Sequence, residues 1–415
     1  MITRYPRATP LLGGLLLTTL LAGCGLRAIK RQSQEIEAFG EIRGRVELAT
    51  EQPGPAYCVL LKDDGKYLTN MLHVLLPRNG EYGFFAPPGR YVVGAFVDAS
   101  RDGEYQRGEP AAYVGMDTGS PVRVVLPPGG RVTVDRMVIK AAVERERTEE
   151  VVDATAKATA NIGKVATLAD PVFSRDSASM GYWRPVDYLR QLGGGLFMLQ
   201  EYEAGKTPVV FVHGADGTAL DFEAVIASLD RGRFQPWVLQ YPSGIRLEIV
   251  SNYLLNALTQ LQTRHQFDGM VLVAHSMGGL VARSFVMRNH ESGSPVRILL
   301  AMTVNSPLHG MRSAQSGVAH SPIVLPSWRD VAYDSEFVRK ILGWPWPKEI
   351  PYHLVFSFEQ GKGSDGVVAL DIALPPSVQA EATRMRGFVA EHTGVLQQAA
   401  FLEYFKETLA RIAPG

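Results

Sequence analysis

The chain is 415 residues long and 46% hydrophobic, which is too long for one small domain and apolar enough for a large core. Acidic and basic residues balance at 42 each, so the net charge gives no electrostatic reason to expect nucleic acid as a partner. The sequence also lacks a long basic run and cysteines at zinc-binding spacing. We therefore expect two folded parts behind a targeting segment.

The first residues have the pattern of a bacterial export signal. Arg4 and Arg7 precede the apolar run LLGGLLLTTLLAG, which is too short to span a bilayer comfortably and ends at Cys24. The run Leu-Ala-Gly-Cys resembles the lipobox of bacterial lipoproteins. That resemblance implies a signal peptide over residues 1–23, acylation of Cys24 and a tether over residues 24–39. A plain signal peptide or an uncleaved anchor is the alternative.

The same resemblance implies where the protein resides. Because glycine rather than aspartate follows Cys24, it favours an envelope protein anchored by lipid in the outer membrane and facing the periplasm. If Cys24 carries lipid, Cys58 has no partner for an intramolecular disulfide, and packing must stabilise the fold. Cys58 lies in the apolar run AYCVLLK, which is typical of a small core residue.

Residues 40–140 predict a small all-β sandwich. Short β-branched or aromatic runs (EIRGRVELA, YCVLLKD, PVRVVLPP and RVTVDRMVI) alternate with Gly, Pro, Asn and Asp. The segment GEYGFFAPPGRYVVGAFVD resembles transthyretin-like or carboxypeptidase-regulatory domains, in which a Pro-Gly turn joins two such strands. The sequence does not identify a protein partner for this sandwich.

The loop DASRDGEYQRGE in this region has oxygen-bearing residues at the spacing of an EF-hand calcium loop. Asp98, Ser100, Asp102 and Glu109 occupy positions 1, 3, 5 and 12, and Gly103 allows the sharp turn. The flanking runs are strands rather than helices, which favours a polar surface hairpin with Asx turns. We expect no required cofactor, and structural calcium is the second interpretation.

Residues 141–200 are predicted to be a helical linker and cover segment. Residues 141–169 are rich in Ala, Glu, Lys and Thr and suit a connecting helix. The run MGYWRPVDYLRQLGGGLF follows as a second candidate cover of the region behind it.

Residues 201–415 alternate strands with helices. The runs TPVVFVHG, FQPWVLQYPSG, GMVLVAHS, VRILLAMTVNSP and YHLVFSFEQG predict strands, and FEAVIASLD, LEIVSNYLLNALTQLQTRH and GGLVARSFVMRN predict helices. Strands joined through helices form a parallel sheet covered on both faces. The fold class is therefore α/β, preceded by a small all-β sandwich.

Ser276 is the candidate nucleophile of this region. Ala274-His-Ser276-Met-Gly278 fits the nucleophile elbow G-x-S-x-G with alanine in the first position. Small residues are needed at both ends of this motif because strand and helix backbones come close. The motif follows a buried-type strand and precedes an apolar helix, which is the context it requires. An ordinary hydroxyl at a strand end is the alternative.

His213, Gly214 and Ala215, at the end of the strand VVFVHGA, resemble the oxyanion loop of lipases and esterases of the α/β-hydrolase superfamily. The resemblance implies that the backbone N–H groups of Ala215 and Met277 bind the oxyanion. It also implies that the His213 side chain shapes the loop and is not the base.

An α/β hydrolase requires the chain order serine, acid, histidine. Asp365, in GKGSDGVV, is the preferred acid because many lipase-like hydrolases carry aspartate followed by Gly-Val-Val at this place. His392, in GFVAEHTGVL, is the preferred base because imidazole accepts and returns a proton near neutral pH. The alternatives are Asp330 and Asp334 for the acid, and His309 and His353 for the base.

These residues predict a serine hydrolase that cleaves carboxylic esters, with acyl or lipid esters as substrates. Ser276 would attack the carbonyl carbon, His392 would move the proton, and Asp365 would stay ionised, giving an acyl-enzyme that water hydrolyses. An acyltransferase with the same triad and a non-catalytic envelope lipoprotein are the alternatives.

An insertion over residues 311–351 is predicted to form a cap above the strand ends. It contains Trp344 and Trp346, which alternate with prolines. Their rings indicate an acyl chain or another hydrophobic ester portion as the ligand. The alternative is that they only pack the cap onto the domain.

Overall fold

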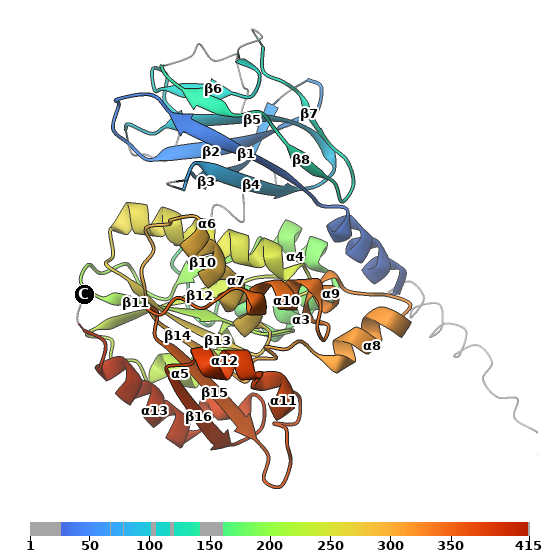
Figure 1. The fold of residues 1–415 in the computed structure, drawn as a ribbon, viewed down its shortest axis with the longest axis vertical. Coiled ribbons are helices and arrows are strands. Elements are labelled where there is room, and N and C mark those ends of the chain that lie inside the picture. The colour runs from blue at the N-terminus through green and yellow to red at the C-terminus, as the bar shows by residue number, and fades with distance from the viewer. Residues whose placement is uncertain are drawn as a thin grey trace, which may run out of the picture.

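The computed structural model describes residues 26–66, 68–77, 79–100, 105–116, 120–141 and 161–413. Figure 1 shows a β part above an α/β part, with a helix of residues 26–37 beside them. The strands of the β part are β1 (Gly40–Leu48), β2 (Ala56–Asp63), β3 (Leu68–Leu75), β4 (Glu81–Ala86), β5 (Gly89–Val97), β6 (Ala111–Tyr113), β7 (Val124–Leu126), β8 (Arg131–Thr133) and β9 (Met137–Ile139).

The α/β part contains the remaining elements. Its strands are β10 (Gly195–Met198), β11 (Thr207–Val212), β12 (Phe234–Gln240), β13 (Met270–His275), β14 (Ile298–Val304), β15 (Tyr352–Phe358) and β16 (Arg384–Val389). Its helices are α3 (Arg175–Trp183), α4 (Pro185–Gln191), α5 (Glu223–Ala227), α6 (Leu247–His265), α7 (Gly278–Glu291), α8 (Arg312–His320), α9 (Pro326–Val331), α10 (Glu336–Gly343), α11 (Leu370–Ala373), α12 (Pro376–Glu381) and α13 (Ala399–Ala410).

Two sheets form the β part. In one, β1 pairs with β4 antiparallel and with β8 and β9 in parallel; the other has the order β3-β2-β5-β6, with β7 paired to β5. Ile42 of β1 and Phe84 of β4 share one buried cluster with Cys58 of β2 and Val93 of β5, so the inner faces of the two sheets pack together. Cys58 is buried in this core as a free thiol.

The Pro-Pro-Gly turn of this part connects its two layers. It joins β4 to β5, and these strands belong to different sheets. The Tyr91 hydroxyl donates to the Pro87 carbonyl at 2.6 Å and so holds the turn against β5. The sequence pattern did not indicate β3 or the short β6.

A seven-stranded sheet forms the core of the α/β part, in the order β10-β12-β11-β13-β14-β15-β16. β10 is antiparallel to β12, and every other neighbouring pair is parallel. Because β10 begins at Gly195, the sheet starts ahead of the predicted boundary at residue 201. The short run after three glycines gave no strand signal by itself, because its burial comes from pairing with β12.

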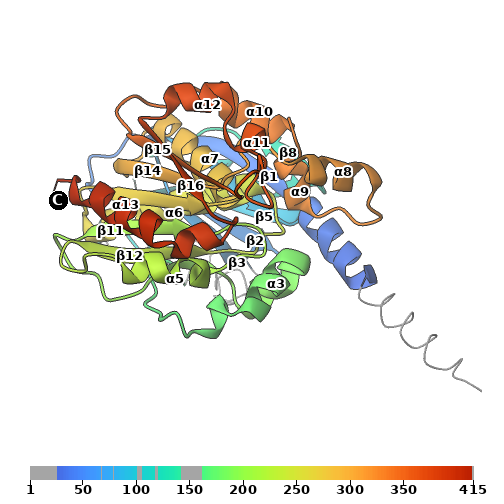
Figure 2. The same ribbon diagram turned by 90° about the horizontal axis from the view of Figure 1, so that it is seen from below.

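Helices cover both faces of this sheet. Val210 and Val212 of β11 belong to the buried cluster that contains α6 and α7, whereas Val209 and Phe211 belong to the cluster that contains α5 and α13. α5 and α13 lie side by side on that second face (Figure 2). A strand buried on both faces has no polar side, which explains the continuously apolar runs of the sequence.

Residues 161–169 are not helical, contrary to the connecting helix predicted over residues 141–169; residues 142–160 lie outside the described part. The segment runs along β10 instead, where the Gly163 N–H donates to the Leu196 carbonyl at 2.8 Å. The backbone pairing offered by the free edge of β10 outweighs the modest helix propensity of this composition.

The predicted cap insertion folds into α8, α9 and α10, and the helix of residues 26–37 packs beside it (Figures 1 and 2). Ser33 Oγ donates to the Val324 carbonyl at 2.5 Å, and Glu37 forms an ion pair with Arg329 at 2.5 Å. The expected tether over residues 24–39 is therefore mostly a packed helix, because its side chains find partners on the cap.

The β part contacts the α/β part through β3 and α6, and the Asn79 side chain donates to the Glu291 carbonyl at 3.5 Å. The cleft between them, about 790 Å³, is lined mostly by charged and polar side chains. No helix within the described ranges is both long and apolar enough to cross a membrane. The predicted signal peptide over residues 1–23 and Cys24 lie outside those ranges.

Asp330 of α9 ties the cap to the start of α6. Its Oδ2 accepts the Leu247 N–H at 2.7 Å, its Oδ1 pairs with Arg246 at 2.7 Å, and its side chain is fully buried. Burial raises the pKa of Asp330, and Arg246 opposes that shift.

The variant Asp330→Ala should lower the free energy of unfolding by about 2–3 kcal/mol, because it removes the acceptor of a buried N–H and the partner of Arg246. Urea titration measures this loss. The matched control is Asp334→Asn, whose side chain is 53% exposed and 3.9 Å from Arg339 and whose φ of 53° asparagine tolerates. The control should shift stability by less than about 0.5 kcal/mol. Equal stabilities of the two variants would contradict the prediction.

Candidate active site

Ser276 lies in the turn between β13 and α7. Its φ is 54°, in the left-handed region that a non-glycine residue occupies only when its surroundings hold it there. Its N–H donates to the Val304 carbonyl at the end of β14, at 2.9 Å. This strained strand-to-helix turn has the geometry expected of the G-x-S-x-G pattern, and it presents Ser276 Oγ at the carboxyl edge of the sheet.

The small residues around Ser276 are required by the approach of neighbouring backbones. A Cβ on Gly278 would lie 2.3 Å from the Val212 carbonyl oxygen, and one on Gly214 would lie 2.7 Å from Ser276 Cβ. Ala274, in the first position of the motif, is fully buried at the end of β13. The oxyanion loop and the elbow are therefore in direct contact.

Three side chains from three loops form a hydrogen-bonded chain. Ser276 Oγ donates to His392 Nε2 at 2.9 Å, and His392 Nδ1 donates to Asp365 Oδ2 at 2.7 Å. The three residues follow β13, β15 and β16, and they meet because parallel strands end at one edge of the sheet. In this arrangement the imidazole can take the serine proton while the carboxylate holds its tautomer.

The loop around Asp365 keeps its carboxylate ionised. Asp365 Oδ1 accepts the N–H groups of Val367 at 2.9 Å and Val368 at 2.6 Å. Burial by itself raises the pKa of Asp365, but the hydrogen bond and charge of His392 together with these two amides lower that pKa below its ordinary value. The group is thus an anion at neutral pH.

Two side chains that the sequence reasoning missed hold the backbone of His392. His275 Nε2 and Asn305 Nδ2 both donate to the His392 carbonyl, at 3.0 and 2.8 Å. Asn305 has a φ of 49°, and its Oδ1 accepts the Ser357 N–H at 2.6 Å. Burial, aided by the charge of His392, lowers the pKa of His275 to about 4, so His275 is a neutral donor. The only sequence signals for these two residues are their positions: His275 lies inside the elbow, and Asn305 directly follows a strand.

The expected oxyanion donors border the same cavity as Ser276. Ala215 and Met277 both line it, and neither backbone N–H has an acceptor among the residues that the structure describes. The His213 side chain lies behind this loop, where Nδ1 donates to the Gly214 carbonyl at 2.9 Å. Burial lowers the pKa of His213 to about 4, and its two ring nitrogens bond to the Gly214 carbonyl and the Tyr241 N–H rather than to the Ser276 hydroxyl.

A cavity of about 270 Å³ lies between Ser276 and the cap. Its wall is mostly apolar and comes from α9, the start of α8, the loop after Asp365 and the last turn of α3. The main lining residues outside the elbow are Tyr182, Pro307, Met311, Trp328, Val331 and Val368. The cover segment ahead of the sheet thus reaches the site through Tyr182.

Trp344 and Trp346 do not line this cavity. Trp346 is buried with its ring stacked on Tyr352, with the ring centroids 4.6 Å apart. Trp344 packs edge-on against His290, with the ring centroids 5.6 Å apart. The packing interpretation therefore describes both tryptophans, and the tryptophan that lines the cavity is Trp328. Proline-flanked tryptophans indicate burial, but not the surface on which they are buried.

The alternative acids and bases take no part in the hydrogen bonds that link Ser276, His392 and Asp365. His353 begins β15 and bonds to the Tyr404 hydroxyl at 2.8 Å, and burial lowers the pKa of His353 to about 4. His309 packs its ring against Tyr333 at 4.7 Å. Asp330 is engaged with α6, as described above.

The calcium-loop pattern is described only in part, because Asp102 and Gly103 lie outside the described residues. Glu109 is buried, and its carboxylate accepts the N–H groups of Ala99, Ser100 and Gln106 at 2.8–3.0 Å. Its oxygens therefore organise the loop itself. The described ranges hold no group of three or more metal-ligating side chains.

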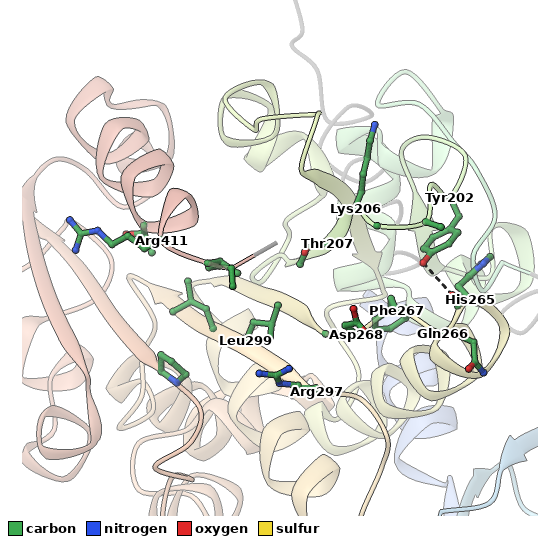
Figure 3. A pocket seen from close by; sticks show the side chains of 18 of the residues that line it. Tyr202, Lys206, Thr207, His265, Gln266, Phe267, Asp268, Arg297, Leu299 and Arg411 are labelled. Atoms are coloured by element: carbon green, nitrogen blue, oxygen red, sulfur yellow. Dashed lines mark hydrogen bonds between the residues drawn. The ribbon is translucent and has the colours of Figure 1, made fainter. Parts of the chain in front are cut away.

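A larger cavity of about 590 Å³ lies at the opposite edge of the sheet (Figure 3). It is lined at the amino ends of the parallel strands, for example by Thr207 at the start of β11. Figure 3 shows Lys206, Arg297 and Arg411 pointing in different directions rather than toward one another. Ligands of parallel α/β sheets bind at the carboxyl ends of the strands, so this cavity is not part of the candidate site.

Residues 246–372 match the model of a family described as "Alpha/beta hydrolase of unknown function (DUF915)". The match includes the elbow and Asp365 and stops short of His392. With the sheet order described above, this match supports an α/β-hydrolase fold for the C-terminal part, as predicted. No curated protein matches the chain.

Several solved structures resemble the chain at low identity. A mature Bacillus licheniformis lipase is 16% identical, with 51% of this chain and 94% of that chain covered and a TM-score of 0.41. Aspergillus fumigatus lipase B is 17% identical, with 51% and 54% covered and a TM-score of 0.39. A haloalkane dehalogenase from Agrobacterium tumefaciens is 13% identical, with 53% and 97% covered and a TM-score of 0.40. Likeness at this level carries no argument about substrate.

The variant Asn305→Ala should slow the covalent reaction of Ser276 with a fluorophosphonate by about tenfold, because it removes one of the two donors that hold the His392 backbone. The rate of labelling measures the effect, and Ser276→Ala should show no labelling. The control Asn256→Ala, on α6 and facing the cleft below the β part, should label at the wild-type rate. A wild-type rate in Asn305→Ala would contradict the positioning role.

Proposed function

We propose that this chain is a serine hydrolase that cleaves carboxylic esters through Ser276, His392 and Asp365. The observation that carries the proposal is the continuous hydrogen-bonded chain from Ser276 Oγ through the imidazole to Asp365, with distances of 2.9 and 2.7 Å. The left-handed φ of Ser276 supports it, because backbone strain of this kind gathers at functional sites.

The proposed reaction has two halves. Ser276 Oγ bonds to the carbonyl carbon while its proton passes to His392 Nε2, which gives a tetrahedral oxyanion. The bond to the alcohol oxygen then breaks, and the alcohol leaves with the proton from His392. Water repeats the sequence on the acyl-enzyme and releases the acid. Asp365 remains ionised and stabilises the imidazolium.

The backbone N–H groups of Ala215 and Met277 are the proposed oxyanion donors. Their shared position in the wall of the cavity and their free hydrogen-bonding capacity support this role. One such donor contributes about 3 kcal/mol to stabilisation of the transition state.

The proposed substrates are esters with a compact acyl group. The mostly apolar wall favours a hydrophobic ligand portion, and a volume of about 270 Å³ lies just below the range of pockets that hold drug-sized ligands. Trp344 and Trp346 are not part of this wall and give no support to a hydrophobic ligand.

The proposed location is the bacterial envelope, with a lipid anchor at Cys24 and the protein facing the periplasm. The lipobox-like sequence supports it, and the described part of the chain starts at residue 26 in a packed helix. The membrane is then a partner through the anchor.

The variant Ser276→Ala should lower hydrolysis of p-nitrophenyl esters, tested from acetate to palmitate, by at least about 10⁴-fold, because no other group supplies the nucleophile. Asp365→Asn should lower it by about 10⁴-fold through the wrong imidazole tautomer. Both variants should keep the wild-type melting temperature within a few degrees. Wild-type turnover in Ser276→Ala would exclude this serine as the nucleophile.

Replacement of Cys24 by serine should move the protein from the membrane fraction to the soluble periplasmic fraction, because the acyl anchor cannot form. Cell fractionation followed by immunodetection measures the distribution. The control Cys58→Ser leaves the predicted anchor intact and should stay with the membrane. Membrane retention of the Cys24→Ser variant would contradict the lipobox interpretation.

A further inference from the structure

The cavity above Ser276 has a few polar residues in a mostly apolar wall, among them Ser313 of α8 and a hydrogen-bonded pair. Tyr182 of α3 and Trp328 of α9 both line it, and Trp328 Nε1 donates to the Tyr182 hydroxyl at 2.7 Å. Ser327, next to Trp328 on α9, borders the same cavity. No charged side chain occurs among the described residues that line it.

The Tyr182 hydroxyl has an unused proton. A phenol has one proton to donate, and the oxygen of Tyr182 already accepts the indole N–H. Within the described part of the chain no acceptor receives the Tyr182 proton. Because Tyr182 lines the cavity, a ligand that covers its hydroxyl without accepting the proton would leave a donor unpaired, so the wall favours a ligand that brings an acceptor.

Ser327 is another polar residue that borders the cavity. Its side chain is fully buried, and its hydroxyl has no hydrogen-bond partner among the residues described. Native proteins contain few buried hydroxyls of this kind, and each calls for an explanation.

Backbone contacts between α3, α9 and the loop after β12 hold this wall in place. The Ser327 N–H donates to the Gly244 carbonyl at 3.1 Å, and the Gly244 N–H donates to the Gly181 carbonyl at 3.1 Å. A Cβ on Gly244 would lie 2.1 Å from the Tyr182 carbonyl oxygen, so α3, α9 and the loop after β12 are in close contact. A hydroxyl placed by backbone packing gives a preorganised contact for a ligand.

We propose that the Tyr182 hydroxyl donates a hydrogen bond to a neutral oxygen of the substrate's acyl group, so that the preferred substrates are esters of hydroxy-, oxo- or ether-substituted acids rather than of plain alkyl acids. The inference rests on the proposed serine-hydrolase function. The acyl group remains bound to Ser276 through both halves of that reaction, whereas the alcohol leaves after the first, so we assign the cavity over Ser276 to the acyl group.

The size of the effect follows from the unpaired donor. An alkyl acyl group would cover the Tyr182 hydroxyl without accepting its proton, while an oxygen at the same place pairs with it. Sites built to bind a substrate oxygen discriminate against the analogue that lacks it, because the polar group of the protein is left unpaired.

The test compares esters of equal size that differ by one atom. For each protein, kcat/KM is measured with p-nitrophenyl methoxyacetate against p-nitrophenyl butyrate, and with p-nitrophenyl 3-methoxypropionate against p-nitrophenyl valerate. In each pair an ether oxygen replaces a methylene group. Dividing the ratio of a variant by that of the wild type removes the difference in intrinsic reactivity between the two esters.

The variant Tyr182→Phe should lower the ether-to-alkyl ratio by about tenfold in at least one pair, because it deletes the donor and keeps the ring. The variant Trp328→Phe removes the N–H that orients the hydroxyl and should lower the same ratio by a smaller factor. It also decides the question if Tyr182→Phe melts below the assay temperature. The matched control Tyr202→Phe, whose hydroxyl bonds to the His265 carbonyl at the opposite edge of the sheet, should keep the wild-type ratio.

The outcomes separate this inference from the proposed function. Ser276-dependent hydrolysis with a wild-type ratio in both Tyr182→Phe and Trp328→Phe would overturn the inference alone. Absence of Ser276-dependent hydrolysis with all four esters would overturn the proposed function and the inference with it. A ratio lowered in both variants and unchanged in Tyr202→Phe would support the inference.

Discussion

The close approach of β11, β13 and α7 is the constraint on which the candidate site depends. No Cβ fits on Gly278 beside the Val212 carbonyl, and none fits on Gly279 beside Ser306. The turn between β13 and α7 must therefore be tight, and Ser276 takes a left-handed φ that costs about 1–3 kcal/mol. Burial of the two strands on both faces of the sheet offsets this strain, so the large core and the strained serine belong to one arrangement.

The parallel sheet fixes where its strands end, and the loops at its carboxyl edge carry the candidate catalytic residues. Parallel strands bring Ser276, Asp365 and His392 together although they come from three separate loops. The His392 ring is held by Asp365, and the His392 backbone carbonyl accepts hydrogen bonds from His275 and Asn305. The cap covers this edge, and the helix of residues 26–37 packs on the outer side of the cap.

Much of the α/β part could be predicted because its signals are local. α6 spans Leu247–His265, the same limits as the helical pattern of the sequence, and β11 coincides with a continuous apolar run. The exceptions depend on partners far along the chain. Residues 161–169 and β10 are ordered by pairing along the edge of the sheet, and the helix of residues 26–37 is ordered by packing on the cap, so their own composition gave weak or misleading signals.

The sequence by itself determined the order of the candidate triad and the small residues around Ser276, because the chemistry and the backbone contacts demand those residue types at those positions. Only the tertiary structure decided which side of the cap faces the cavity. It buried Trp346 against the sheet and placed Trp328 against Tyr182, a residue 146 positions away. The hydrophobic pattern of a segment encodes that it is buried, but the partner of each side chain is chosen by packing between elements that are distant along the chain.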